Sequence, residues 1–141
     1  MPVREATGIW EGGLRDGSGT VKTGSGALDT PYNFPSRFEE GDTTNPEELI
    51  GAAHAACYSM ALSAGLEKAG YPATQVKTTA KVHFTKLDVG FRITEITLIT
   101  KAKVPNISEA DFKEQAEGAK TGCPISNALS VEITLDAELI S

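Results

Sequence analysis

The sequence predicts an α+β fold in which antiparallel sheets surround one buried central helix. Glycine-rich turns punctuate the first forty residues, residues 46–68 carry an uninterrupted helical pattern, and several later segments alternate apolar and polar residues as strands do. Strands, helix, strands, helix and strand in this order are typical of an α+β domain with antiparallel sheet. With 141 residues, the chain is expected to form a single domain over residues 1–141.

The first forty residues predict a small antiparallel meander. Glycines at 12–13, 16–19 and 24–26 separate short segments that can form strands. Tight turns between adjacent strands are the usual place for such glycines.

A long helix is predicted from Pro46 to about Lys68. Asn45 is a favourable N-cap, Pro46 suits the first turn, and Glu48 completes a capping-box pattern. Gly70 can adopt the left-handed conformation that follows many helices. Apolar residues lie nearly all the way round this helix, so we expect it to be buried on all sides, by sheet or by a second copy of the protein.

Two paired strands are predicted to follow. Residues 76–86 alternate apolar and polar side chains, which is typical of a half-buried strand. Within residues 91–104 the apolar parity changes, which predicts a β-bulge near residues 94–95. Residues 88–90 provide the hairpin turn.

The C-terminal part predicts a second helix and a last strand. Ser108 begins this helix and Gly122 ends it, after which Cys123 at an N-cap and Pro124 at the first position can start a short helix. Residues 131–139 alternate as the last strand.

Charge and hydropathy exclude several classes of partner. The net charge is −6 without a basic cluster, which argues against nucleic-acid binding. No apolar run is expected to approach the ~20 residues of a membrane span, and the first residues lack an apolar secretory signal. We therefore expect a cytoplasmic protein, in which two cysteines fit a redox couple better than a structural disulfide.

The two cysteines, Cys57 and Cys123, are the leading candidates for chemistry. Small neighbours leave space around Cys57, although a small core residue is an equally good interpretation. Cys123 is expected at a helix N-terminus, where backbone N–H groups favour the thiolate. A peroxide-reducing thiol enzyme needs one cysteine to attack and one to resolve.

Arg37 and Glu47 could supply the charge that a thiolate needs. Arg37 lies between aromatic residues, and its simplest interpretation is a surface arginine that packs on Phe38. Glu47, in the first helical turn, complements the helix dipole. The functional hypothesis is that Glu47 orients Arg37 through a charge-assisted pair.

A zinc site is the leading alternative from the residues alone. His54 and Cys57 have the i, i+3 spacing of a chelating pair. His83, however, falls on the solvated face of its strand, and His54 is more often a core residue with satisfied nitrogens. A non-catalytic binding or redox-sensing protein is the other alternative.

The motifs around both cysteines resemble those of the OsmC/Ohr peroxidases. Residues 45–58 (NPEELIGAAHAACY) resemble the first-cysteine motif, and residues 122–126 (GCPIS) resemble the second. Residues 10–12 (WEG) and 37–39 (RFE) are similar to the osmotically inducible protein C (OsmC) branch. The resemblance covers essentially the whole chain.

This resemblance implies a thiol-dependent peroxidase that favours organic hydroperoxides over hydrogen peroxide. It implies that Cys57 is the peroxidatic cysteine, that Cys123 resolves it, and that Arg37 and Glu47 form the activating pair. It further implies an intertwined homodimer, a dithiol reductant and no metal or organic cofactor. Phe38, Met60 and Ile125 are hypothesised to form the apolar wall for the peroxide.

Overall fold

The computed structural model describes residues 2–141. It divides into two compact units, Met1–Leu49 and Ile50–Ser141, which are described separately. The prediction of one domain over residues 1–141 stays a prediction. The elements in chain order are β1 (Ala6–Glu11), β2 (Ser18–Thr23), β3 (Asp29–Tyr32), α1 (Phe34–Phe38), α2 (Pro46–Lys68), β4 (Gln75–Leu87), β5 (Gly90–Lys103), α3 (Glu109–Gly122), α4 (Pro124–Ala128) and β6 (Glu132–Ile140).

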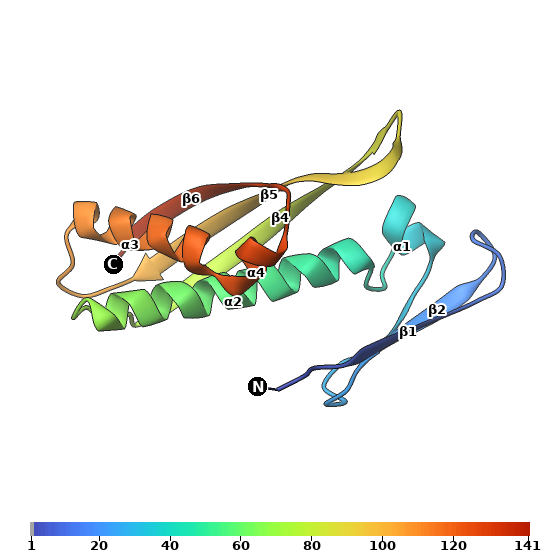
Figure 1. Ribbon diagram of the computed structural model, residues 1–141, viewed down its shortest axis with the longest axis horizontal. Helices are drawn as coiled ribbons and strands as arrows, with labels where there is room; N and C mark the ends of the chain where they lie inside the picture. Colours follow the sequence, from blue (N-terminus) through green and yellow to red (C-terminus); the bar gives the residue numbers. More distant parts are fainter. Residues whose placement is uncertain (1) are drawn as a thin grey trace. The chain divides into compact units, whose positions relative to one another are not determined.

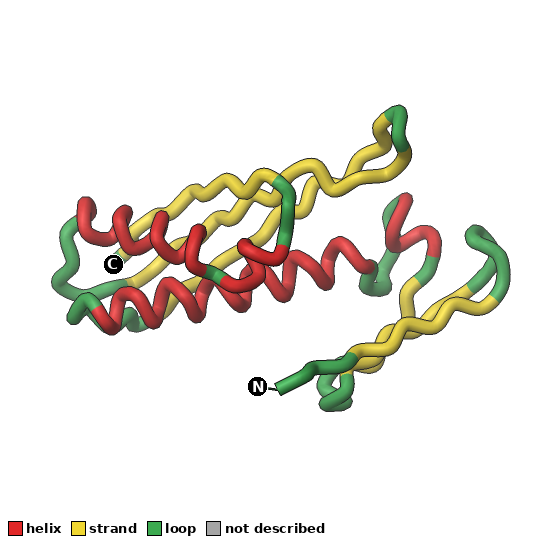
Figure 2. The backbone as a smooth tube through the Cα atoms, viewed as in Figure 1, coloured by secondary structure: helices red, strands yellow, loops and turns green. Residues whose placement is uncertain are grey.

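The first unit contains the predicted meander and one helix that was not predicted. Strands β1, β2 and β3 pair antiparallel in chain order (Figure 2). Helix α1 was missed because five residues are too few to show a helical period. Its signal was the cap: the backbone N–H of Ser36 donates to Asn33 Oδ1 at 3.0 Å, and Pro35 lies in the first turn.

Helix α2 begins and ends where the sequence predicts. The backbone N–H of Glu48 donates to Asn45 Oδ1 at 2.8 Å, and Gly70 has a φ of 93°. The capping box differs from the prediction, since Glu48 Oε2 accepts a hydrogen bond from the Thr44 hydroxyl at 3.1 Å. The N-terminus of α2 is thus fixed by Asn45.

The second sheet has the order β4-β5-β6 and departs from the prediction at one pairing. Glu95 pairs with His83 and Ile93 with Phe84, so Thr94 is the extra residue of the predicted bulge. Strands β5 and β6 are parallel, so the expectation of purely antiparallel sheets was wrong here. The physical reason is the connection: α3 and α4 form a crossover long enough to return the chain to the end at which β5 starts.

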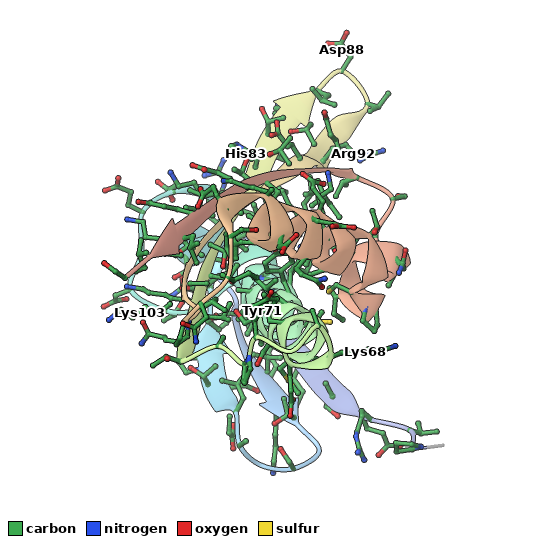
Figure 3. The ribbon with its side chains drawn as sticks, turned by 90° about the vertical axis from the view of Figure 1, so that its left-hand side faces the viewer. Lys68, Tyr71, His83, Asp88, Arg92 and Lys103 are labelled. Carbon is green, nitrogen blue, oxygen red and sulfur yellow. The ribbon has the colours of Figure 1, made fainter. Side chains whose placement is uncertain are left out.

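Helices α2 and α3 lie on one face of this sheet (Figures 1 and 3). The β4–β5 hairpin, with Asp88 at its tip, extends beyond these helices (Figure 3). Side chains from α2, β5 and α3 form the core between the layers. The largest buried apolar ones are Tyr58, Phe112, Leu62, Leu66, Ile96 and Leu98.

Only one stripe of α2 is buried within the chain, so the sheet of a single copy does not bury this helix on all sides, and burial by a second copy stays a prediction. The stripe runs along Gly51, His54, Tyr58, Leu62 and Leu66, at the i, i+3 and i+4 spacing of one helix face. The other side exposes alanines at 52, 53, 56 and 64, and Met60 is 75% exposed. A single copy of the chain therefore leaves an apolar helix surface uncovered.

The expectation that no apolar run approaches a membrane span is also corrected by α2. Within residues 2–141, this 23-residue helix is long and apolar enough to cross a membrane by length and composition, with a mean hydropathy of 1.3 in its most apolar window. Core helices of soluble proteins meet the same criterion. The length and composition of α2 are therefore weak evidence, by themselves, for a membrane span.

Gly51 brings α2 close to strand β4. A Cβ atom at this position would lie 3.3 Å from Val82 Cγ2. We expect Gly51→Leu to lower the free energy of unfolding by about 1–3 kcal/mol, since extra atoms in a packed interface force the layers apart. Gly118→Ala is the matched control: nothing lies within 4 Å of its Cβ position, and we expect a gain of about 0.5–1 kcal/mol from helix propensity. Urea unfolding at one protein concentration measures both, and an unchanged midpoint in Gly51→Leu would contradict the close packing.

Candidate active site

The two cysteines meet in the second unit, one from α2 and the other from the α3–α4 junction. Cys57 comes from the middle of α2 and is half-buried, whereas Cys123 is fully buried at the junction of α3 and α4. Their sulfur atoms lie 2.8 Å apart, joined by a thiol–thiol hydrogen bond. A disulfide has an S–S length of about 2.05 Å, so an oxidant could join the two sulfur atoms with only a small movement of either residue.

The α3–α4 junction holds Cys123 in place. The backbone N–H of Cys123 donates to Ala119 O at 2.9 Å and closes α3, while Pro124 begins α4 as predicted. The amide of Asn127 donates to Thr121 O at 3.0 Å and to Cys123 O at 3.3 Å. The turn is therefore tied on both sides of the sulfur-bearing residue.

The surroundings favour negative charge on Cys123 rather than on Cys57. Burial raises the pKa of Cys57, and its hydrogen bond to Cys123 raises this pKa further. Burial alone would also raise the pKa of Cys123, but polar interactions of its sulfur with Cys57, with the backbone and hydroxyl of Ser126 and with the backbone of Ile125 outweigh it and lower this pKa. The expected depression at Cys123 is present, whereas a thiolate at Cys57, predicted from the charge of Arg37, stays a prediction.

Arg37 and Glu47 form an ion pair within the first unit. Arg37 Nε donates to Glu47 Oε1 at 2.9 Å, and the Glu47 side chain is only 9% exposed. The guanidinium also lies over the Phe38 ring, 5.4 Å from its centroid. Both sequence interpretations of Arg37 therefore hold at once, the pairing with Glu47 and the packing on Phe38.

Short polar contacts between α1 and the start of α2 position this pair. The Asn45 amide donates to Ser36 O at 2.8 Å, and the hydroxyls of Ser36 and Thr43 are hydrogen-bonded. The second carboxylate oxygen of Glu47, Oε2, is buried without a hydrogen-bond partner. The buried Glu47 carboxylate, whose other oxygen, Oε1, pairs with Arg37 Nε, therefore fixes the direction of the guanidinium.

An aromatic hollow of about 200 Å³ lies beside Arg37. The rings of Trp10 and Tyr32 are 5.4 Å apart, and those of Phe34 and Phe38 are 4.8 Å apart. The sequence indicated Phe38 as an apolar wall but gave no reason to group it with Trp10 and Tyr32, because strand pairing brings these together. The lining residues are Trp10, Leu14, Tyr32, Asn33, Phe34, Arg37 and Phe38.

His54 is a buried polar residue that contacts the loop of the second cysteine. His54 Nε2 and Ser126 Oγ are 2.8 Å apart, while His54 Nδ1 has no hydrogen-bond partner. The expectation of a core histidine is met, but only one of its nitrogens is satisfied. Ser126 was missed by sequence reasoning, since a serine in a first helical turn is common.

The side chains of residues 2–141 form no arrangement that supports the alternative of a zinc site. No group of three or more His, Cys, Asp or Glu side chains is placed to hold a metal ion in this part of the chain. His83, the other histidine, is exposed and hydrogen-bonds Thr97 Oγ1 at 3.1 Å.

Comparison with known proteins relates the chain to thiol peroxidases. The family model for OsmC-like proteins matches residues 39–138. Peroxiredoxin OsmC of Escherichia coli (strain K12) is 53% identical over 133 residues, which cover 94% of this chain and 93% of that protein. The organic hydroperoxide resistance protein OhrB of Bacillus subtilis (strain 168) is 27% identical over 124 residues, covering 86% of this chain and 89% of that protein.

A solved structure agrees with these sequence matches. The crystal structure of an organic hydroperoxide resistance protein from Elizabethkingia anophelis, with thiocyanate bound, has a TM-score of 0.78 at 26% identity and covers 99% of this chain and 98% of that one. The matches extend over nearly the whole length of each protein. The chain belongs to the OsmC-like protein family.

Proposed function

We propose that this protein is a thiol-dependent peroxidase that reduces organic hydroperoxides and, less efficiently, hydrogen peroxide. The observation that carries the proposal is the pair Cys57 and Cys123, with sulfur atoms 2.8 Å apart in a chain of the OsmC-like family. Peroxiredoxin OsmC and OhrB are named for activity on peroxides and resistance to organic hydroperoxides. Thiol chemistry accounts for this activity without a further cofactor.

Cys57 is the attacking residue in this proposal, because it is the half-buried member of the pair. Its thiolate attacks one peroxide oxygen, the O–O bond breaks, and an alkoxide leaves and takes a proton. Cys57 is thereby oxidised to a sulfenic acid. The Cys123 sulfur then displaces hydroxide from Cys57, which forms the disulfide, and the hydroxide becomes water on protonation. A dithiol reduces this disulfide and completes the cycle.

Arg37 and Glu47 are proposed to activate this chemistry. A guanidinium near Cys57 opposes the effect of burial and favours the thiolate, and it also stabilises charge on the leaving oxygen. The ion pair with Glu47 at 2.9 Å supports a fixed direction for the guanidinium. The aromatic hollow, with Arg37 in its wall, suits the organic part of a hydroperoxide.

An intertwined homodimer is part of the proposal. The apolar side of α2 that a single chain leaves exposed, including Met60, suits a second copy of this chain. Ala56→Glu places a charge on this side, so we expect a lower apparent mass in light scattering after gel filtration. Ala110→Glu, the same substitution at an exposed position of α3, is the matched control and should leave the apparent mass unchanged. A wild-type monomer would contradict the dimer.

The setting that we propose is the cytoplasm, where reducing conditions regenerate dithiols. The decisive experiment measures consumption of cumene hydroperoxide and of hydrogen peroxide with a dithiol reductant. We expect faster turnover of the organic substrate. No turnover in fully reduced protein would favour the alternative, a redox-sensing protein without catalysis.

A further inference from the structure

His54 and Ser126 take no part in the chemistry described above, yet they reach the sulfur pair from a second direction. His54 comes from α2 and Ser126 from α4, and the two are hydrogen-bonded at 2.8 Å. Cys123 is the N-cap of α4 and Ser126 is the third residue of that helix, so the serine hydroxyl lies on the side of the sulfur, where it lowers the pKa of Cys123. His54 and Cys123 are fully buried, and Ser126 is 8% exposed. A continuous polar path therefore leads through the core to one sulfur atom.

We infer that His54 and Ser126 form a hydrogen-bond relay that holds Cys123 as a thiolate, the form that resolves the sulfenic acid and leaves on reduction. In this relay, His54 Nε2–H donates to Ser126 Oγ, and the Ser126 hydroxyl donates to Cys123 Sγ. Ser126 touches the reacting sulfur, whereas His54 is a positioning residue that acts through Ser126. This inference rests on the proposed peroxidase function.

Proton counting fixes the direction of the relay. A serine hydroxyl has a single proton, so a hydroxyl that donates to Cys123 must accept at its oxygen from His54. His54 then carries its proton on Nε2, and the buried Nδ1 without a partner is a bare lone pair rather than an unpaired donor. Burial lowers the pKa of His54, which favours the neutral ring that this arrangement requires.

The histidine also prevents a competing contact of the serine. A serine in a first helical turn can rotate its hydroxyl toward nearby backbone groups instead of the sulfur. The N–H of His54 occupies the oxygen lone pair on one side, which leaves the hydroxyl proton for Cys123. Two other titratable groups near the sulfur are Cys57 and Tyr58, and burial raises the pKa of both. The charge of Glu117, which pairs with Lys120 at 3.4 Å, raises the pKa of Tyr58 further.

The chemical step concerned is disulfide formation. The Cys123 thiolate donates an electron pair to the Cys57 sulfur, the S–S bond forms, and the S–O bond of the sulfenic acid breaks. Hydroxide leaves with that bonding pair and is protonated to water. Cys123 is oxidised and the Cys57 sulfur is reduced, so no outside oxidant or reductant enters this step.

Titration of Cys123 tests the relay without any peroxide. In a Cys57→Ser background, thiolate absorbance in the ultraviolet follows the remaining cysteine against pH. We expect Ser126→Ala to raise the midpoint by about one pH unit, a tenfold change that corresponds to loss of one hydrogen bond to a charged group. Ser126→Thr, which keeps the hydroxyl, should restore most of the shift. Ser59→Ala is the matched control, since its hydroxyl donates to Thr78 at 2.8 Å instead.

Disulfide formation after one equivalent of organic hydroperoxide, without reductant, gives the second readout. With Cys57 and Cys123 both present, Ser126→Ala should slow this step about three- to tenfold below the wild-type midpoint, because about tenfold less Cys123 is ionised there and the greater nucleophilicity of a less acidic thiol offsets only part of this loss. The slowing should disappear at alkaline pH, where Cys123 is ionised in both proteins. A merely structural defect would slow the step equally at all pH values.

Two results would overturn the relay: an unchanged Cys123 midpoint in Ser126→Ala, or a pH-independent slowing. If Ser126→Ala does not fold, His54→Gln and His54→Leu repeat the comparison, since only glutamine offers an N–H to Ser126; equal midpoints in these two would overturn the relay as well. Failure of the wild type to consume organic hydroperoxide would refute the proposed function, and the Cys123 midpoint would still decide this inference.

Discussion

Replacement of Cys57 by serine is expected to lower organic hydroperoxide turnover by on the order of a thousandfold or more, the scale seen when a catalytic nucleophile is removed. A serine hydroxyl is not ionised near neutral pH and cannot form the sulfenic acid or the disulfide. Steady-state consumption of cumene hydroperoxide with a dithiol reductant measures the loss. Circular dichroism should show an unchanged fold, because serine differs from cysteine by one atom.

Cys123→Ser is the matched variant for this experiment. It keeps the attacking sulfur, so we expect about one equivalent of peroxide to be consumed rapidly without reductant, with a sulfenic acid at Cys57 that dimedone traps. The wild type should instead give the Cys57–Cys123 disulfide by mass spectrometry. Normal turnover in Cys57→Ser would contradict the assigned order of the two thiols.

Replacement of Arg37 by alanine is expected to lower the rate of peroxide reduction by about 10²–10³, the loss that follows removal of one group that stabilises charge in a transition state. Burial raises the pKa of Cys57, so a thiolate near neutral pH needs a nearby cation. In a Cys123→Ser background, the titration midpoint of Cys57 should therefore rise in Arg37→Ala by about 1–3 pH units.

Arg15→Ala is the control for the loss of Arg37. Arg15 also lies over an aromatic ring of the first unit, 4.7 Å from the centroid of Phe34, so its removal takes away the same charge and the same type of contact. We expect a Cys57 midpoint close to that of the wild type. An equal midpoint in wild type and Arg37→Ala would remove Arg37 from the proposed activating pair.

Elements with a local signal were predictable from the sequence. The cap at Asn45 and the alternation in β4 are properties of neighbouring residues, and both appear where expected. The parallel pairing of β6 was not predictable in this way, because alternation defines the faces of a strand but not its direction. How α2 is covered was not predictable either, since composition cannot distinguish a surface covered within one chain from a surface that a second copy would cover.

In the candidate site, too, only the residues with a local sequence signal could be assigned a role from the sequence. Cys57, Cys123, Arg37 and Glu47 stand in recognisable motifs, and the structure brings them together in two pairs. Ser126 also stands in a motif, residues 122–126, but the motif gives no role to this serine. Its importance depends on contact with His54, which lies 72 residues earlier in the chain.

The separation of the two cysteines in the sequence affects the stability of the oxidised protein. Their disulfide would enclose a loop of 66 residues that holds the C-terminal half of α2, strands β4 and β5 and all of α3. In the chain-entropy description, closure of such a loop lowers the entropy of the unfolded chain and stabilises the folded state by on the order of 4 kcal/mol. By linkage, the oxidised form resists heat and denaturants more than the reduced form does. Oxidation by its own substrate would thus stabilise this protein under the oxidising conditions that damage other proteins.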